Sequence, residues 1–195
     1  MPIYNRRSIR KFSSKEIPVE TIDQILDAGR VAPSAKNRQP WKYIVFGGQK
    51  KDELLNVMES GILREEREEA VLPDFANGIA DAKNTLRAMR EAPIVIMVEN
   101  TNGHNPFEML EVHGRFVEIC DSLSIGASIE NILLKAQELG LGTLWIGNTC
   151  FAYQELVAYL HTEGQLIGAI AVGYANENPV ARPRKKLEDI VEYRI

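Results

Sequence analysis

Histidine and cysteine are scarce in this sequence, with three and two residues respectively among 195. The histidines (His104, His113 and His161) form no H-E-x-x-H or H-x-x-x-H pattern, and the cysteines lack metal-ligand spacing. We therefore predict no metal site, and we expect surface or hydrogen-bonded histidines, not catalysts. Cys120 and Cys150 lie among apolar residues, which predicts two buried free thiols in a reducing compartment and disfavours a disulfide.

Long hydrophobic runs and an excess of positive charge are also absent. No apolar stretch reaches the roughly 18 residues that span a bilayer, and no charged-then-apolar leader opens the chain. The formal net charge is −4, and the isoelectric point is near 5.5. These values argue against nucleic acid or anionic membranes as partners, although they allow a local basic pocket. We expect a soluble, cytoplasmic protein that binds neither nucleic acid nor membrane.

Familiar catalytic motifs are missing as well. The sequence has no G-x-S-x-G turn, no Walker A loop, and no G-x-G-x-x-G that opens a helix after a strand. No side chains form a recognisable nucleophile and base, so the sequence yields no catalytic residue. An enzyme without its own acid–base set often leaves the chemistry to a cofactor.

The pattern of elements predicts one globular domain over residues 1–195. Hydrophobic residues make up 45% of the chain and charged residues 26%, which is typical of a folded protein with a core. Helical periodicity predicts helices at about 18–32, 49–58, 77–90, 107–139 and 153–160. Short β-rich runs predict strands at 43–46, 94–98, 142–146 and 166–172, with a β-prone terminus at 190–195. Such an alternation indicates an α/β or α+β class.

Two of these segments carry more specific predictions. From Ile119 onwards the 107–139 segment is apolar all round, which predicts a central buried helix. Its small residues, from Ser124 to Ser128, would let another backbone approach, either from the same chain or from a second subunit. The mixed charge run from Arg64 to Glu69 instead predicts a solvated helix face.

Three polar segments stand out from this framework. Residues 5–12 and 182–186 each hold four cations, and residues 32–41 join a helix to a strand with more residues than most such joints need. Taken alone, they could be a basic tail and a plain surface loop. Arginine forks also suit phosphate, and amide side chains suit the edge of a heteroaromatic ring, so a cofactor cradle is the functional alternative.

The order of these segments is specific. The chain contains Arg-Arg-Ser-Ile-Arg at 6–10, Ala-Pro-Ser-Ala-Lys-Asn-Arg-Gln-Pro-Trp at 32–41, Gly-Leu-Gly-Thr-Leu-Trp-Ile-Gly at 140–147, and Arg-Pro-Arg at 182–184 with Leu-Glu-Asp at 187–189. This series resembles the FMN-dependent nitroreductase family over residues 3 to about 193. The resemblance implies an α+β fold, a three-layer α/β/α sandwich with a central mixed sheet flanked by helices. It also implies an intertwined homodimer that holds FMN at the subunit interface, with a C-terminal arm at about 176–195.

The resemblance further implies which residues bind the cofactor. Ten positions match: Arg6, Arg7, Ser8, Arg10, Asn37, Gln39, Gly147, Asn148, Arg182 and Arg184. The first four match positions that contact the phosphate, the ribityl chain and the ring edge, and the last two match a basic pair that closes over the phosphate. Asn37 matches an asparagine beside the flavin ring, and Gln39 lies in the same loop. Gly147 and Asn148 match a pair whose backbone amides approach flavin N5, although several relatives have glycine in place of Asn148.

The implied activity is that of an FMN-dependent NAD(P)H oxidoreductase. Such an enzyme takes hydride from NADH or NADPH and reduces nitroaromatics, quinones or similar electron-poor acceptors by ping-pong kinetics. Three alternatives stay open: specialised flavin chemistry such as reductive dehalogenation or flavin reduction, a flavin-binding or redox-sensing protein without turnover, and an interaction domain that has lost flavin. The sequence names neither the acceptor nor the preferred nicotinamide.

Overall fold

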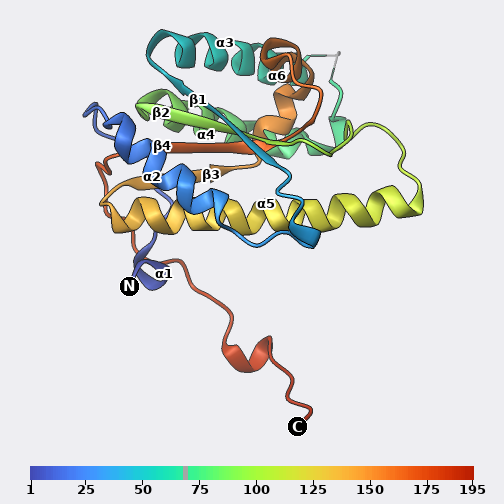
Figure 1. The fold of residues 1–195 in the computed structure, drawn as a ribbon. Helices are drawn as coiled ribbons and strands as arrows, with labels where there is room; N and C mark the ends of the chain where they lie inside the picture. The colour runs from blue at the N-terminus through green and yellow to red at the C-terminus, as the bar shows by residue number, and fades with distance from the viewer. Residues whose placement is uncertain (68–69) are drawn as a thin grey trace.

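A four-stranded sheet lies between two layers of helices in the computed structural model, which describes residues 1–67 and 70–195 (Figure 1). The strand order is β1-β2-β4-β3, with bounds β1 Trp41–Gly47, β2 Ile94–Asn100, β3 Gly142–Ile146 and β4 Gln165–Gly173. We expected a mixed sheet, but these strands all pair antiparallel. In the described parts of the chain, parallel pairing is limited to one isolated bridge between Ser8 and Thr143.

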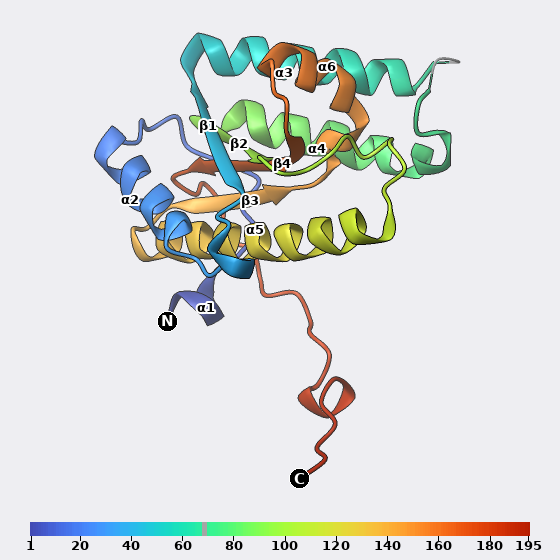
Figure 2. The same ribbon diagram turned by 45° about the vertical axis from the view of Figure 1, so that its right-hand side comes forward.

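Helices cover both faces of this sheet, so the predicted α+β sandwich is confirmed. Helices α2 (Val19–Arg30) and α5 (Val112–Glu138) lie on one face, while α3 (Gly48–Glu65), α4 (Ile79–Glu91) and α6 (Tyr153–Leu160) lie on the other (Figures 1 and 2). Shorter helical segments are α1 (Pro2–Asn5), η1 (Ala35–Asn37), η2 (Pro73–Gly78), η3 (Asn148–Ala152) and η4 (Leu187–Asp189). Helix α3 runs further than predicted, and α5 begins at Val112 and continues without a break. The β-prone terminus at 190–195 forms no strand.

A hydrophobic core lies on each face of the sheet, and strand β2 contributes side chains to both cores. Val95 and Met97 point to the α3/α4 side, and Ile96 and Val98 point to the α2/α5 side, as the alternation of a strand requires. All four are at most 1% exposed. Full burial of such a side chain stabilises the fold by about 1.5–3 kcal/mol, so β2 is the energetic centre of the sheet.

Within one chain, helix α5 is buried on one side only. Ile125, Ile129 and Ile132 are fully buried beneath the sheet. On the opposite side Phe116 is 65% exposed and Leu123 is 70% exposed. The helix therefore presents a second apolar face that one chain leaves uncovered.

The small residues of α5 bring α2 and the following loop close within the same chain. Ser128 Oγ donates a hydrogen bond to the Gly29 carbonyl at 2.9 Å, and Ser124 Oγ accepts one from the Ala35 amide at 3.1 Å. A Cβ atom added to Gly29 would lie 2.7 Å from Ile132 Cγ1, so only glycine allows this approach. The predicted close packing is thus present, with these two serines engaged inside the chain.

The charge run that begins at Arg64 is a solvated face only in part: Glu66 and Arg67 are exposed, as predicted, whereas Arg64 and Glu65 are not. Arg64 donates to the Glu155 carboxylate at 2.6 and 3.2 Å. The Glu65 side chain is 1% exposed and accepts hydrogen bonds from the amides of Val71 (3.1 Å) and Leu72 (2.9 Å). The prediction is wrong for Arg64 and Glu65, because their charges hold α3 against α6 and the next loop. Glu68 and Glu69 lie outside the described residues.

The scarce residue types lie mostly at the surface. All three histidines are exposed, as expected. Cys120 is also exposed and Cys150 is partly buried, so the prediction of two buried thiols is wrong for Cys120, which lies outside the packed face of α5. No helix within residues 1–67 and 70–195 is long and apolar enough to cross a membrane.

Candidate functional site

The two ends of the chain are joined by backbone hydrogen bonds. The Ile9 amide donates to the Thr143 carbonyl of β3, and the Asn176 amide donates to the Lys11 carbonyl, both at 2.9 Å. Ile9 and Phe12 are each 6% exposed and anchor the N-terminal segment in the core, as their apolar character predicts. The C-terminal arm therefore starts beside the N-terminal arginines and then runs away from the body of the protein (Figures 1 and 2).

An arginine pocket of about 380 Å³ forms where these ends meet. Six of the ten predicted residues line it together with Pro179 and Val180: Arg6, Arg7, Ser8, Arg10, Arg182 and Arg184. None of the lining residues is acidic. Arg6 forms an ion pair with Glu130 of α5 at 3.2 Å. Among the described residues the guanidinium groups of the other four arginines form no ion pair, although the Arg10 backbone amide donates to the Glu177 carboxylate. Such a set of uncompensated guanidinium groups suits a phosphate.

A second pocket of about 570 Å³ shares Arg10 with the first. Its other lining residues are Lys11, Asp81, Asn84, Arg87, Glu91 and Glu177. Sequence reasoning missed the four α4 members, Asp81, Asn84, Arg87 and Glu91. They recur at intervals of three, three and four residues on the polar side of an amphipathic helix, and that pattern ordinarily marks a solvated face.

Gly147 and Asn148 lie at the turn after β3, against α4. The Asn148 Nδ2 donates to Asp81 Oδ2 at 3.2 Å and to Thr85 Oγ1 at 3.0 Å. The Asn148 Oδ1 is buried and accepts no hydrogen bond from the described residues. Through Asp81, this turn adjoins the second pocket.

Asn37 and Gln39 lie apart from both pockets. Both side chains are exposed, and both residues adopt positive φ angles, 54° and 49° respectively. Their loop is fixed by Arg38, whose guanidinium donates to the buried Asp121 carboxylate of α5 at 2.7 and 2.9 Å. Within one chain, the ten predicted residues thus form an arginine pocket, an adjacent turn and a separate amide loop.

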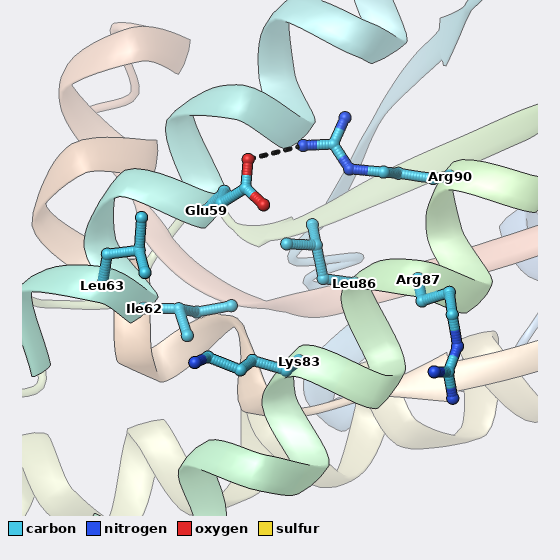
Figure 3. Close-up of a pocket in the computed structure, with 7 residues that line it drawn as sticks. All are labelled: Glu59, Ile62, Leu63, Lys83, Leu86, Arg87 and Arg90. Carbon is cyan, nitrogen blue, oxygen red and sulfur yellow. Dashed lines mark hydrogen bonds and ion pairs between the residues drawn. The ribbon is translucent and has the colours of Figure 1, made fainter. Parts of the chain in front are cut away.

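A third pocket, of about 310 Å³ between α3 and α4, also has cations at its rim (Figure 3). Arg90 forms an ion pair with Glu59 at 3.0 Å, and Lys83 forms one with Glu66 at 2.6 Å. The Arg87 side chain points away from Leu86 and from α3 in Figure 3. Because Arg90 and Lys83 are paired with carboxylates, this pocket offers an anion fewer unpaired cations than the arginine pocket does.

Comparison with known proteins gives the family. The model of the nitroreductase family matches residues 3–174. The chain belongs to the nitroreductase family. The match covers the N-terminal arginines, the amide loop and the turn after β3, whereas Arg182 and Arg184 lie beyond its end.

One archaeal relative is similar to most of the chain. A proposed NADH dehydrogenase/NAD(P)H nitroreductase of Archaeoglobus fulgidus is 33% identical over 145 residues, which are 74% of this chain and 64% of the relative. The chain therefore spans less than two thirds of that protein.

Two solved structures share the nitroreductase fold. A BluB-like flavoprotein from Clostridium difficile 630 has a TM-score of 0.80 at 26% identity and covers 98% of this chain and 96% of its own. The FMN-dependent nitroreductase NfnB from Mycobacterium smegmatis, in complex with NADPH, has a TM-score of 0.79 at 22% identity and covers 98% and 96%. At this identity the second likeness concerns the fold alone.

Proposed function

We propose that this chain is an FMN-dependent oxidoreductase that takes its electrons from NADH or NADPH. One observation carries the proposal: the arginine pocket, in which residues from both ends of a nitroreductase-family chain converge without an acidic lining residue. The Mycobacterium smegmatis structure is described as an FMN-dependent nitroreductase in complex with NADPH, which supports the same cofactor and electron donor here. The name of the archaeal relative, an NAD(P)H nitroreductase, supports the same donor. Nitroaromatics, quinones and similar electron-poor compounds are the acceptors we propose.

The residues present fit FMN. A phosphate monoester carries about −1.5 to −2 charges at neutral pH, and Arg7, Arg10, Arg182 and Arg184 would neutralise it with charge-assisted hydrogen bonds. The second pocket offers donors and acceptors to a larger polar ring, from Asn84, Arg87 and Asp81.

When bound, FMN supplies hydride transfer between the nicotinamide and the acceptor. The protein's contribution is binding and electrostatics. Arg10 belongs to both pockets, so a phosphate in the first pocket and a group in the second could share one guanidinium. The second pocket balances the cations of Arg10, Lys11 and Arg87 with the carboxylates of Asp81, Glu91 and Glu177, so its role in this proposal is to orient a polar ligand. In this proposal the lining residues of both pockets bind and orient the ligand.

The working unit in this proposal is a homodimer. Val112, Phe116, Ile119 and Leu123 recur at intervals of four, three and four residues along the uncovered side of α5, and each is at least 48% exposed. Such a stripe is typical of a helix that packs against another helix. A second copy packed on this face would also bring its own amide loop, with Asn37 and Gln39, to the uncovered side of α5.

We expect Leu123→Glu to break the dimer. The wild-type side chain is 70% exposed in one chain, so the substitution leaves the monomer's core intact while it places charge in the proposed interface. Analytical ultracentrifugation should show a dimer for wild type and a monomer for the variant, with unchanged far-ultraviolet circular dichroism. Val19→Glu on α2, 66% exposed, is the matched control and should stay dimeric. A wild-type monomer at micromolar concentration would contradict the proposed dimer.

The function is tested on the purified full-length chain. We expect a yellow protein that releases FMN on denaturation, and whose flavin absorbance bleaches within seconds when NADH or NADPH is added without oxygen. Addition of menadione or a nitroaromatic compound should then restore the colour. A colourless protein that cannot be reconstituted with FMN would refute the cofactor. Bound flavin that no nicotinamide reduces would instead identify a flavin-binding protein without this activity.

A further inference from the structure

The turn after β3 is held to α4 by one side chain. Asn148 follows Gly147 directly and donates to Asp81 Oδ2 and Thr85 Oγ1 at 3.2 and 3.0 Å. Both acceptors lie on α4, and Asp81 also lines the second pocket.

The orientation of the Asn148 amide is fixed by charge. If the amide were flipped, Oδ1 would face the Asp81 carboxylate, and two acceptors would repel each other at about 3 Å. The observed orientation instead leaves Oδ1 buried without a donor among the described residues. An unmatched buried acceptor is unfavourable, so the two Nδ2 bonds must outweigh it.

We infer that Asn148 and Asp81 form a positioning pair that sets the turn at Gly147 relative to the cofactor pocket. The pair acts through the turn, since the bonds of Asn148 go to α4. This inference rests on the proposed function, because it concerns how the turn meets the bound flavin. It predicts that kcat depends on a hydrogen bond between residues 148 and 81, whichever of the two carries the amide.

An exchange of the two side chains tests this pair. Asn148→Asp places two carboxylates opposite each other, so the turn should move away from α4. Asp81→Asn keeps one oxygen acceptor for Asn148, while it removes the charge and replaces the second oxygen with an NH2 donor. In the double variant Asn148→Asp/Asp81→Asn, the new amide at 81 donates to the new carboxylate at 148, and the bond is restored. Thr85 can donate or accept, so it does not distinguish these variants.

The measurements are made on FMN-loaded full-length protein with NADPH and menadione. We expect kcat to fall about tenfold or more in Asn148→Asp at unchanged FMN content, because small displacements at a reacting group have large kinetic effects. In the double variant kcat should return to within about threefold of Asp81→Asn, since the pair is coupled. A double variant no faster than Asn148→Asp, or an Asn148→Asp enzyme as fast as wild type, would overturn the inference.

Hydrogen exchange of the amides from Gly147 to Cys150, measured on the same proteins without added flavin, gives a second readout. Exchange should accelerate in Asn148→Asp and slow again in the double variant. This readout separates the two claims: if wild type takes up no FMN, the proposed function fails, while the exchange rates still decide whether the pair holds the turn. Equal rates in all four proteins would refute the pair.

Discussion

Replacement of both arginines of the C-terminal arm, Arg182→Ala with Arg184→Ala, is expected to weaken FMN binding about a hundredfold. Hydrogen bonds to charged groups contribute about 1.5–3 kcal/mol each. Both side chains line the arginine pocket from an exposed segment, so we take the lower figure. Two such losses amount to about 3 kcal/mol, or roughly two factors of ten in Kd.

Isothermal titration calorimetry of the flavin-free protein with FMN measures this change in Kd. Lys185→Ala with Lys186→Ala is the matched control, because it removes the same charge from the same arm and neither lysine lines the pocket. The control should bind FMN within about threefold of wild type, since screened surface charges contribute little. If both double variants lose affinity equally, the arm acts only through its net charge and the proposed phosphate contact is wrong.

Arg64→Ala is expected to lower the free energy of unfolding by about 3 kcal/mol, the lower end for removal of one partner from a buried ion pair. The substitution leaves the Glu65 carboxylate, 1% exposed, without its cation. For a chain of this size the melting temperature should fall by about 6–12 °C. Arg30→Ala is the control: it breaks an exposed pair with Asp27, with side chains 64% and 62% exposed, and should change stability by less than about 1 kcal/mol.

The stabilisation from Arg64 should also depend on pH. Burial alone would raise the pKa of Glu155, but the hydrogen bonds and charge of Arg64 outweigh it and hold this pKa below its ordinary value of 4.5. A carboxyl whose pKa is lower in the folded state contributes stability above its unfolded pKa and loses it as the pH falls through the folded pKa. Urea unfolding of wild type and Arg64→Ala should therefore converge below pH 4.5. A constant difference from pH 7 to pH 3 would contradict this account.

The sequence predicted most elements because local patterns dictate them. Pro18 and Pro33 bracket α2, and the unbroken apolar run at β2 indicates a strand covered on both faces. The pairing of strands has no local signal, since β2 pairs with β4 some 70 residues later. That is why the antiparallel sheet had to come from the structure, and a mixed sheet was expected from the resemblance.

The candidate site was predicted where it follows the family motif and missed where it depends on packing. The resemblance supplied Arg6, Arg10, Arg182 and Arg184, which the fold brings to one pocket. Asp81 and Arg87 were missed because a polar helix face has the same pattern at a pocket as in open solvent. Arg64 and Glu65 were misjudged for the same reason, since burial of a charge depends on distant residues such as Glu155.

The strand order β1-β2-β4-β3 has a consequence for synthesis of the chain. During translation, β1 and β2 emerge first, and the inner edge of β2 has no partner until residue 173 has left the ribosome. That edge belongs to a strand that opens with five apolar residues, Ile94-Val-Ile-Met-Val98. Unpaired apolar edges template aggregation, so the nascent chain carries its main aggregation hazard for more than 70 residues of synthesis. Folding yield should therefore respond to translation speed between β2 and β4.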